Sequence, residues 1–165
     1  MSRTFIALLT LSYSPARSNR KNGPRKLFYT HVESQMPISV VRLGTPRTEG
    51  EGLRIGTVRR PPRGVPKADF ARLDYYDVWF PNLAPSAELV QEALTAADDK
   101  AWLAFVRKYR KEMNQTDAAR TLDLLAALSH QTNFAIGCYC ENESRCHRSA
   151  LRELLTERGA SIQNP

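Results

Sequence analysis

The chain has 165 residues, the length of one domain, and it can bury one substantial hydrophobic core. Its 42% hydrophobic and 25% charged residues exclude wholesale disorder, and no apolar run approaches the ~20 residues needed to span a bilayer. The formal net charge of +7 and the pI near 9.6 favour contact with polyanions.

The first half of the chain predicts short strands separated by loops. Residues 5–11 indicate a buried strand rather than a signal peptide, because no A-x-A-like cleavage site follows them. Residues 14–25 are polar, basic and interrupted by Pro15, Gly23 and Pro24, which predicts a flexible basic loop or arm. Further strands are predicted at residues 27–32, 38–43 and 53–58, with a turn or long loop at 44–52.

The second half predicts mainly helices, after a short strand at residues 78–80. Ser86, Asp98 or Asp99, and Thr116 or Asp117 are the expected starts of three helices. Each helix carries apolar residues at helical spacing: Leu89, Val90, Ala93, Leu94 and Ala97; Trp102, Phe105, Val106, Tyr109 and Met113; Leu122, Leu125 and Leu128. The aromatic residues share a stripe with aliphatic ones, so we expect them in the core rather than in a base-stacking platform.

A closing unit of strand, loop and helix completes the pattern, with the strand at residues 134–138 and the helix at 148–158. Gly159 is the expected C-terminal stop of that helix. Strands followed by helices and by this closing unit predict an α/β fold: a single compact domain over residues 1–165, with a mainly parallel sheet flanked by helices.

Charge and cysteine content bear on partners and compartment. Residues 1–67 hold 13 Lys and Arg against 3 Asp and Glu, whereas residues 68–165 hold 11 against 14. This asymmetry predicts a basic face, although a solvated arginine-rich surface without a partner is the alternative. The odd number of closely spaced cysteines does not fit a disulfide framework, so we expect a reducing compartment, the cytoplasm, with thiol or metal chemistry.

The loop after residues 134–138 is the strongest candidate for a functional site. Strand alternation places Cys138 and Cys140 on the same face, and a helix opens near Cys146. A helix N-terminus at the carboxyl end of a strand is a natural anion site. The expected ligand-binding residues there are Arg145, Arg148 and Ser149.

The cysteines of this loop support three other hypotheses. Cys146, between Arg145 and His147, could be a reactive thiolate, although the spacing from Cys140 does not match a phosphatase loop. Cys138, Cys140, Cys146 and His147 could bind zinc, although C-x-C-x5-C-H is not a usual zinc spacing. Alternatively, Cys138 and Cys140 are small buried hydrophobic residues.

A second basic loop follows residues 53–58. Arg59, Arg60 and Arg63 flank a stiffening Pro61-Pro62 pair, and arginine binds phosphate in a bidentate manner. These side chains would converge with Arg148 if the two preceding strands are parallel neighbours; the alternative is a solvated basic loop. His31 and His130 are interpreted as ordinary surface or helix-end residues.

Residues 138–151, CYCENESRCHRSAL, resemble the signature of the family called domain of unknown function 488 (DUF488). The segments at 40–43, 52–65 and 83–89 and the helix containing Trp102, Phe105 and Tyr109 resemble its YeaO-like branch, over about residues 38–159. The resemblance implies a compact α/β fold with both loops at one sheet edge. The family strand before the arginine loop usually carries an aspartate, but Thr57 and Val58 stand here, which implies a more purely cationic site.

These observations predict a cationic site for a phosphate-containing ligand, either a nucleotide or nucleic acid. One alternative is an enzyme that acts on a nucleotide or phosphorylated substrate with Cys146 and His147. Another is a structural zinc module. The sequence contains no complete acid–base pair or triad that would decide between a binding protein and an enzyme.

Overall fold

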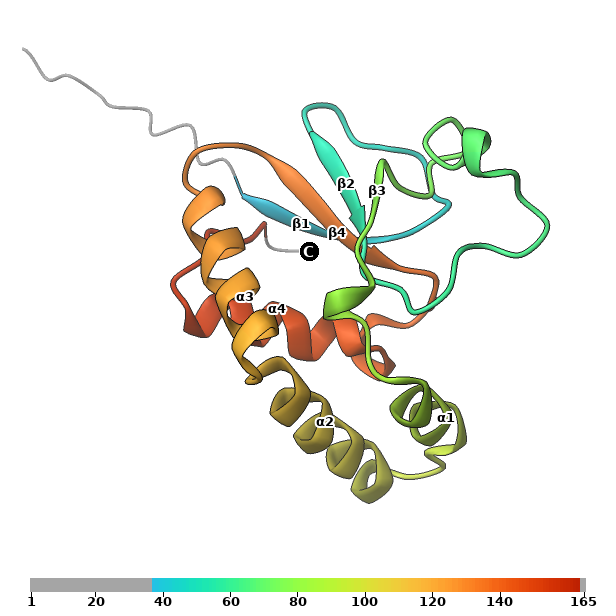
Figure 1. The fold of residues 1–165 in the computed structure, drawn as a ribbon, viewed down its shortest axis with the longest axis vertical. Coiled ribbons are helices and arrows are strands. Elements are labelled where there is room, and N and C mark those ends of the chain that lie inside the picture. Colours follow the sequence, from blue (N-terminus) through green and yellow to red (C-terminus); the bar gives the residue numbers. More distant parts are fainter. Residues whose placement is uncertain (1–36, 164–165) are drawn as a thin grey trace, which may run out of the picture. The chain divides into compact units, whose positions relative to one another are not determined.

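A four-stranded parallel sheet forms the centre of the computed structural model, which describes residues 37–163 (Figure 1). The strands are β1 (Ile38–Arg42), β2 (Leu53–Gly56), β3 (Val78–Trp79) and β4 (Phe134–Cys138), in the order β1-β4-β2-β3. The strands and the arm predicted before residue 37, and His31, lie outside the described residues.

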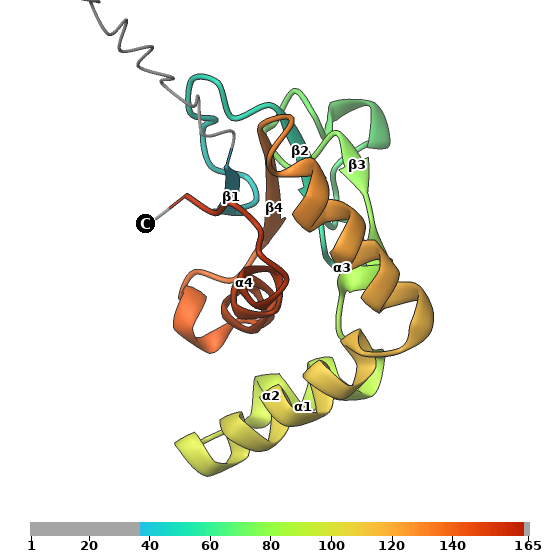
Figure 2. The ribbon, with the colours of Figure 1, turned by 90° about the vertical axis from the view of Figure 1, so that its left-hand side faces the viewer.

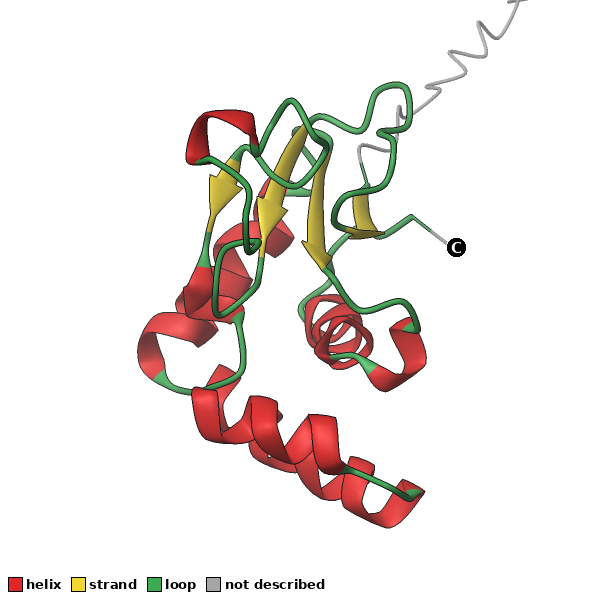
Figure 3. Ribbon diagram, turned by 90° about the vertical axis from the view of Figure 1, so that its right-hand side faces the viewer, coloured by secondary structure: helices red, strands yellow, loops and turns green. Residues whose placement is uncertain are grey.

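β4 is the central strand, and every one of its five residues is buried. It pairs in parallel with β1 on one side and with β2 on the other, which satisfies its backbone groups on both edges. The arrowheads of β2, β3 and β4 point the same way in Figure 3, as parallel pairing requires. The carboxyl ends of β2 and β4, which lead into the two predicted site loops, are therefore neighbours.

Four helices follow the predicted positions: α1 (Ala87–Thr95), α2 (Asp99–Met113), α3 (Thr116–Leu128) and α4 (His147–Glu157). Ser86 caps α1 by accepting a hydrogen bond from the Leu89 amide, and Asp98 caps α2 by accepting one from Ala101. Gly159 follows α4 with a φ of +77°, the left-handed conformation that ends many helices.

The helices cover one face of the sheet. Side chains from all four helices form one core with Ile38, Phe134 and Ile136 of the strands. In Figure 2, α1, α2 and α4 lie below the strands, and α3 runs down from the level of the strands toward α2. Loops cover the other face. The side chain of Leu43 packs against Gly137, and that of Tyr76 packs against Gly56, so closely that a Cβ on either glycine would overlap it.

The expected apolar stripe of α2 is confirmed, because Trp102, Phe105, Tyr109 and Met113 are all buried. The stripe of α1 was predicted too wide: Leu94 is 74% exposed, and α1 ends at Thr95, before Ala97. Within residues 37–163, every helix is too short or too polar to cross a membrane.

Candidate functional site

The candidate site lies at the carboxyl edge of the sheet, between the end of β4 and the start of α4. Cys138 is the last residue of β4, and Cys146 is the N-cap of α4. A single 3-10 turn, Glu143–Arg145, joins them; Asn142 caps it by accepting a hydrogen bond from the Ser144 amide. This short connection returns the chain to the strand end, so the sulfur atoms of the loop come together.

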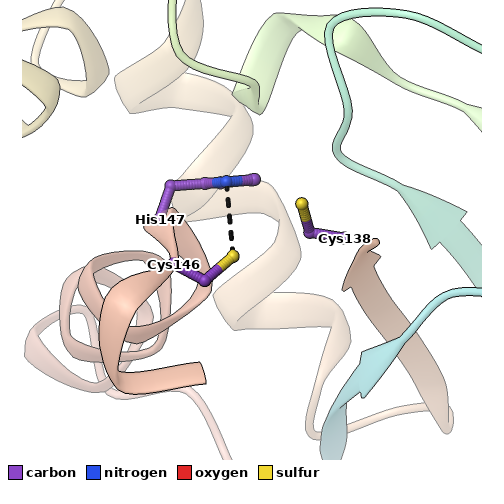
Figure 4. Close-up of side chains that lie close together, drawn as sticks. All are labelled: Cys138, Cys146 and His147. Atoms are coloured by element: carbon purple, nitrogen blue, oxygen red, sulfur yellow. Dashed lines mark hydrogen bonds between the residues drawn. The ribbon is translucent and has the colours of Figure 1, made fainter. Parts of the chain in front are cut away.

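The three cysteines form a cluster of free thiols. The Sγ atoms of Cys138 and Cys140 are 3.7 Å apart, as strand alternation predicted. The ligand atoms of Cys138, Cys146 and His147 all lie within 4.8 Å of one another, and Figure 4 shows them facing one another from β4 and α4. Cys138 and Cys146 are buried, whereas Cys140 is exposed. Cys140 therefore presents the accessible thiol, not Cys146.

His147 is fixed by the neighbouring strand-end loop. Its Nε2 atom lies 2.8 Å from the carbonyl oxygen of Thr57, which only accepts hydrogen bonds, so Nε2 carries a proton. Nδ1 consequently faces the Sγ atom of Cys146, 3.7 Å away. The ring packs edge-on against Tyr109, at a centroid distance of 5.6 Å. The imidazole thus has one defined orientation, with Nδ1 turned toward the thiols.

Arg148 is a buried cation beside the cluster. It is 3% exposed, and its Nη2 atom donates a 2.7 Å hydrogen bond to the carbonyl oxygen of Cys140. Its Nε atom is buried and has no hydrogen-bond partner among the described residues. It forms no ion pair with a carboxylate in residues 37–163. A buried guanidinium without a counter-charge is unfavourable, so its partner is a thiolate or a ligand.

The cluster divides its protons unequally. Hydrogen bonds from the Cys138 and Cys146 thiols, together with the nearby charge of Arg148, lower the pKa of Cys140 to about 3. The hydrogen bond to Cys140 and burial raise the pKa of Cys138 far above its usual range. A hydrogen bond from Cys138 and the neighbouring His147 lower the pKa of Cys146. The cluster thus favours ionisation of Cys140 and disfavours ionisation of Cys138.

The other predicted ligand-binding residues lie around this cluster in different roles. Arg59 donates hydrogen bonds to the carbonyl oxygens of Ala84 and Pro85. Arg145 pairs with Asp99 and lies over the ring of Trp102. Ser149 donates to the carbonyl oxygen of Cys146 within the first turn of α4. The side chain of Arg59 thus joins two loops, and that of Arg145 joins the cysteine loop to α2.

Arg60 and Arg63 are exposed and make no side-chain hydrogen bond within the described part of the chain. The Tyr139 hydroxyl donates to the carbonyl oxygen of Arg60 at 3.3 Å, which joins the arginine loop to the cysteine loop. His130 is exposed at a helix end, with Nε2 2.8 Å from the Gly159 carbonyl oxygen.

Sequence reasoning missed two contributors to the site. Thr57 was noted only as the place of a missing aspartate, yet its carbonyl oxygen orients His147 and its hydroxyl donates to the Gly137 carbonyl oxygen. Tyr109 was assigned to the core, and it also supports the imidazole ring. The signal in the sequence that could have identified Thr57 was its position at the end of the predicted strand that leads into the arginine loop.

Comparison with known proteins identifies the family. The family model DUF488-N3a, described as the active DUF488-N3 subclade, matches residues 38–159. The chain belongs to the DUF488 family. The match covers the span expected from the sequence resemblance, while the YeaO-like branch stays a prediction. No curated protein and no solved structure matches this DUF488 chain.

Proposed function

We propose that this DUF488 protein binds a phosphate-containing ligand, a nucleotide or a nucleic acid, at the carboxyl edge of its sheet. Arg148 is the central cation of the proposed site. The observation that carries the proposal is that Arg148 is 3% exposed, lacks a carboxylate partner within residues 37–163 and retains an unpartnered Nε atom.

Arg54 provides an internal comparison, because it is also fully buried. Its guanidinium is paired with the carboxylate of Glu51 and donates to the carbonyl oxygens of Thr45 and Asp74. Arg54 is thus paired with a carboxylate within the fold, whereas Arg148 has none within residues 37–163 and its Nε atom has no hydrogen-bond partner there. A buried cation near a helix start with an unpartnered donor favours an external anion.

Arg60 and Arg63 supply the outer part of the proposed site. Both side chains are exposed, and the bond between Tyr139 and the Arg60 carbonyl oxygen keeps their loop beside Cys140. Phosphate is the favoured anion because guanidinium groups match its geometry in a bidentate manner.

Calorimetric titration with inorganic phosphate, nucleotides and short oligonucleotides tests the proposal. We expect Arg148→Lys, and a double Arg60→Gln and Arg63→Gln variant, to weaken binding of the same ligand. Arg120→Gln on the exposed surface of α3 is the matched control and should leave binding unchanged. Equal affinity in all four proteins, or no binding of any phosphate compound, would contradict the proposal. Steep salt dependence with oligonucleotides alone would indicate nucleic acid.

An enzyme that acts on a nucleotide or phosphorylated substrate is the alternative for this site. The exposed Cys140 is then a better nucleophile candidate than the buried Cys146. Any ligand that binds should be assayed for turnover with Cys140→Ser, which is expected to bind but not to react. Full turnover by that variant would remove the Cys140 thiol from the chemistry.

Zinc binding is the second candidate function, and the ligand geometry favours it. Tetrahedral zinc, with Zn–S bonds of about 2.3 Å and Zn–N bonds of about 2.0 Å, places two sulfur ligands about 3.8 Å apart and sulfur and nitrogen about 3.6 Å apart. The observed separations are 3.7 Å for Cys138 and Cys140, and 3.7 Å for Cys146 and His147.

The orientation of His147 also suits a zinc ligand. Histidine ligands commonly donate their second ring N–H to a carbonyl oxygen, which leaves the other nitrogen for the metal. Nε2 of His147 donates to Thr57 in this way, and Nδ1 faces the sulfurs. Cys138, Cys146 and His147 supply three ligand atoms within 4.8 Å of one another, and Cys140, 3.7 Å from Cys138, is the expected fourth ligand of a Cys3His set, a common zinc set.

Metal analysis and cobalt substitution test the zinc proposal. We expect about one zinc per chain, and a cobalt form whose thiolate charge-transfer absorption falls in Cys138→Ser and in Cys146→Ser. His130→Ala, at an exposed histidine, should keep both properties. A wild-type protein without bound metal, or a cobalt spectrum without thiolate bands, would exclude this function.

A further inference from the structure

The three thiols differ in accessibility in a way that neither phosphate nor zinc binding requires. Cys140 is exposed, whereas Cys138 and Cys146 are 7% and 2% exposed. An oxidant from solvent therefore meets Cys140 first. The sulfur of the buried Cys138 lies near it, at an Sγ–Sγ separation of 3.7 Å.

Closure of a disulfide between these two residues requires the sulfur atoms to approach to about 2.05 Å. Cys138 is held in the strand ladder opposite Arg42 of β1, whereas Cys140 lies beyond the end of β4. Movement of the Cys140 side chain and its loop can therefore close the remaining distance while the sheet stays intact. The hydrogen bond from Arg148 to the Cys140 carbonyl oxygen keeps the loop near the strand end.

Cys146 is the alternative partner, but its surroundings disfavour it. Its side chain is buried at the N-cap of α4, and its Sγ atom faces Nδ1 of His147. The Sγ atom of Cys138, by contrast, lies 3.7 Å from that of Cys140.

We propose that Cys140 is a site of reversible oxidation by hydroperoxides, with Cys138 as the thiol that resolves the oxidised form. In the first step the Cys140 sulfur attacks the distal oxygen of a hydroperoxide; the O–O bond breaks, and the products are the sulfenic acid of Cys140 and an alcohol, or water from hydrogen peroxide. The sulfur is oxidised by two electrons and the peroxide is reduced by two. The Cys138 thiol then attacks the sulfenic sulfur, the S–S bond forms, the S–O bond breaks and water leaves.

The oxidation proposal does not rest on phosphate binding, and it applies to protein from which metal has been removed with a chelator. Bound zinc would engage the same sulfur atoms, so zinc-loaded protein should be oxidised more slowly than the chelated form. Phosphate titrations performed under reducing conditions are unaffected by either outcome.

Peptide mapping separates the possible disulfides. Trypsin cuts after Arg120 and Arg145, so Cys138 and Cys140 share one peptide and Cys146 falls in the next. A Cys138–Cys140 bond leaves that peptide intact and two hydrogens lighter, whereas any bond to Cys146 links two peptides. The experiment treats chelated protein with hydrogen peroxide, traps sulfenic acid with dimedone and records the tryptic masses.

We expect the internal disulfide in the wild type and in Cys146→Ser, and its loss on treatment with a dithiol reductant. In Cys138→Ser the sulfenic acid of Cys140 should persist and form the dimedone adduct, whereas Cys140→Ser should form neither product. Cys140 that stays reduced in the wild type, or a disulfide that contains Cys146, would overturn the proposal. The wild-type map decides this even if a variant at the buried Cys138 fails to fold.

Discussion

Two buried arginines lie at opposite ends of the sheet, and only one of them is paired with a carboxylate. Arg54, at the start of β2, pairs with Glu51 through its Nε and Nη2 atoms, with N–O distances of 2.6 and 2.7 Å. Arg148, at the carboxyl edge, has a single carbonyl partner. The first arrangement stabilises the fold, and the second leaves a charge available for a ligand or a thiolate.

Glu51→Gln is expected to destabilise the protein by about 3–5 kcal/mol, because it leaves the buried charge of Arg54 without its partner. Urea unfolding monitored by circular dichroism measures the loss. The exposed neighbour Glu49 is the matched site: Glu49→Gln should change stability by less than about 0.5 kcal/mol. Equal stabilities of the two variants would show that the Glu51–Arg54 pair contributes little.

The sequence predicted the neighbouring positions of Cys138 and Cys140 but not the partners of most arginines, for a physical reason. Strand alternation is local, so the side-by-side sulfurs of Cys138 and Cys140 follow from their spacing. The direction of an arginine side chain depends on groups distant in the sequence. Arg59 reaches the carbonyl oxygens of Ala84 and Pro85, and Arg145 reaches Asp99, which no local pattern specifies.

At the scale of elements, glycines determine how closely loops approach the sheet. Gly52, just before β2, has a φ of +77°, and a Cβ there would overlap the carbonyl oxygen of Asn133. Gly64 has a φ of +72°, but a Cβ there would meet nothing within 4 Å. Both glycines therefore adopt a positive φ, but only Gly52 lacks the space for a side chain.

Gly64→Ala is expected to cost about 1–2 kcal/mol, the cost of placing a side chain in the left-handed region. Gly52→Ala should cost a further ~1–3 kcal/mol, because the added methyl group must displace the loop at Asn133. Thermal unfolding of both variants measures the difference. If they are destabilised equally, the close approach at Gly52 carries no energetic cost.

The helices and strands within residues 37–163 were largely predictable because periodicity and capping residues are local signals. The caps Ser86 and Asp98, the aromatic stripe of α2 and the strand Phe134–Cys138 all occur where predicted. The exposure of Leu94 was not predictable, because the side of α1 that meets α2 depends on tertiary packing.

At the scale of the whole described unit, the two sheet faces are stabilised differently. The helical face is one large apolar core, whereas the loop-covered face combines a smaller apolar cluster with an ionic network that joins the loops to β2. Asp77 accepts hydrogen bonds from Arg47 and from the backbone amide of Arg54. The structure places β2 beside β4. The sequence did not predict this pairing, and the convergence of the two loops was expected only if these strands were parallel neighbours, because strand pairing is non-local.

This ionic network predicts that acid weakens the loop-covered face before the helical core. Hydrogen bonds from Arg47 lower the pKa of Asp77 from its ordinary value of 3.8, against the effect of burial. Burial alone would raise the pKa of Glu51, but the hydrogen bonds from Arg54 and Thr48 lower it from 4.5. Both folded-state pKa values are depressed, so the unfolded chain binds more protons in this range.

The stabilisation from both carboxylates is therefore present above pH 4.5 and is lost as the pH falls through their folded-state pKa values. Urea unfolding at successive pH values from neutral to acid should show a falling free energy of unfolding in the wild type. The fall should be shallower in Asp77→Asn, which has one fewer depressed carboxyl group, than in Asp117→Asn, a change at an exposed position on α3. Parallel curves for these two variants would mean that Asp77 titrates alike in the folded and unfolded chains, and that the network does not hold the loops to the sheet.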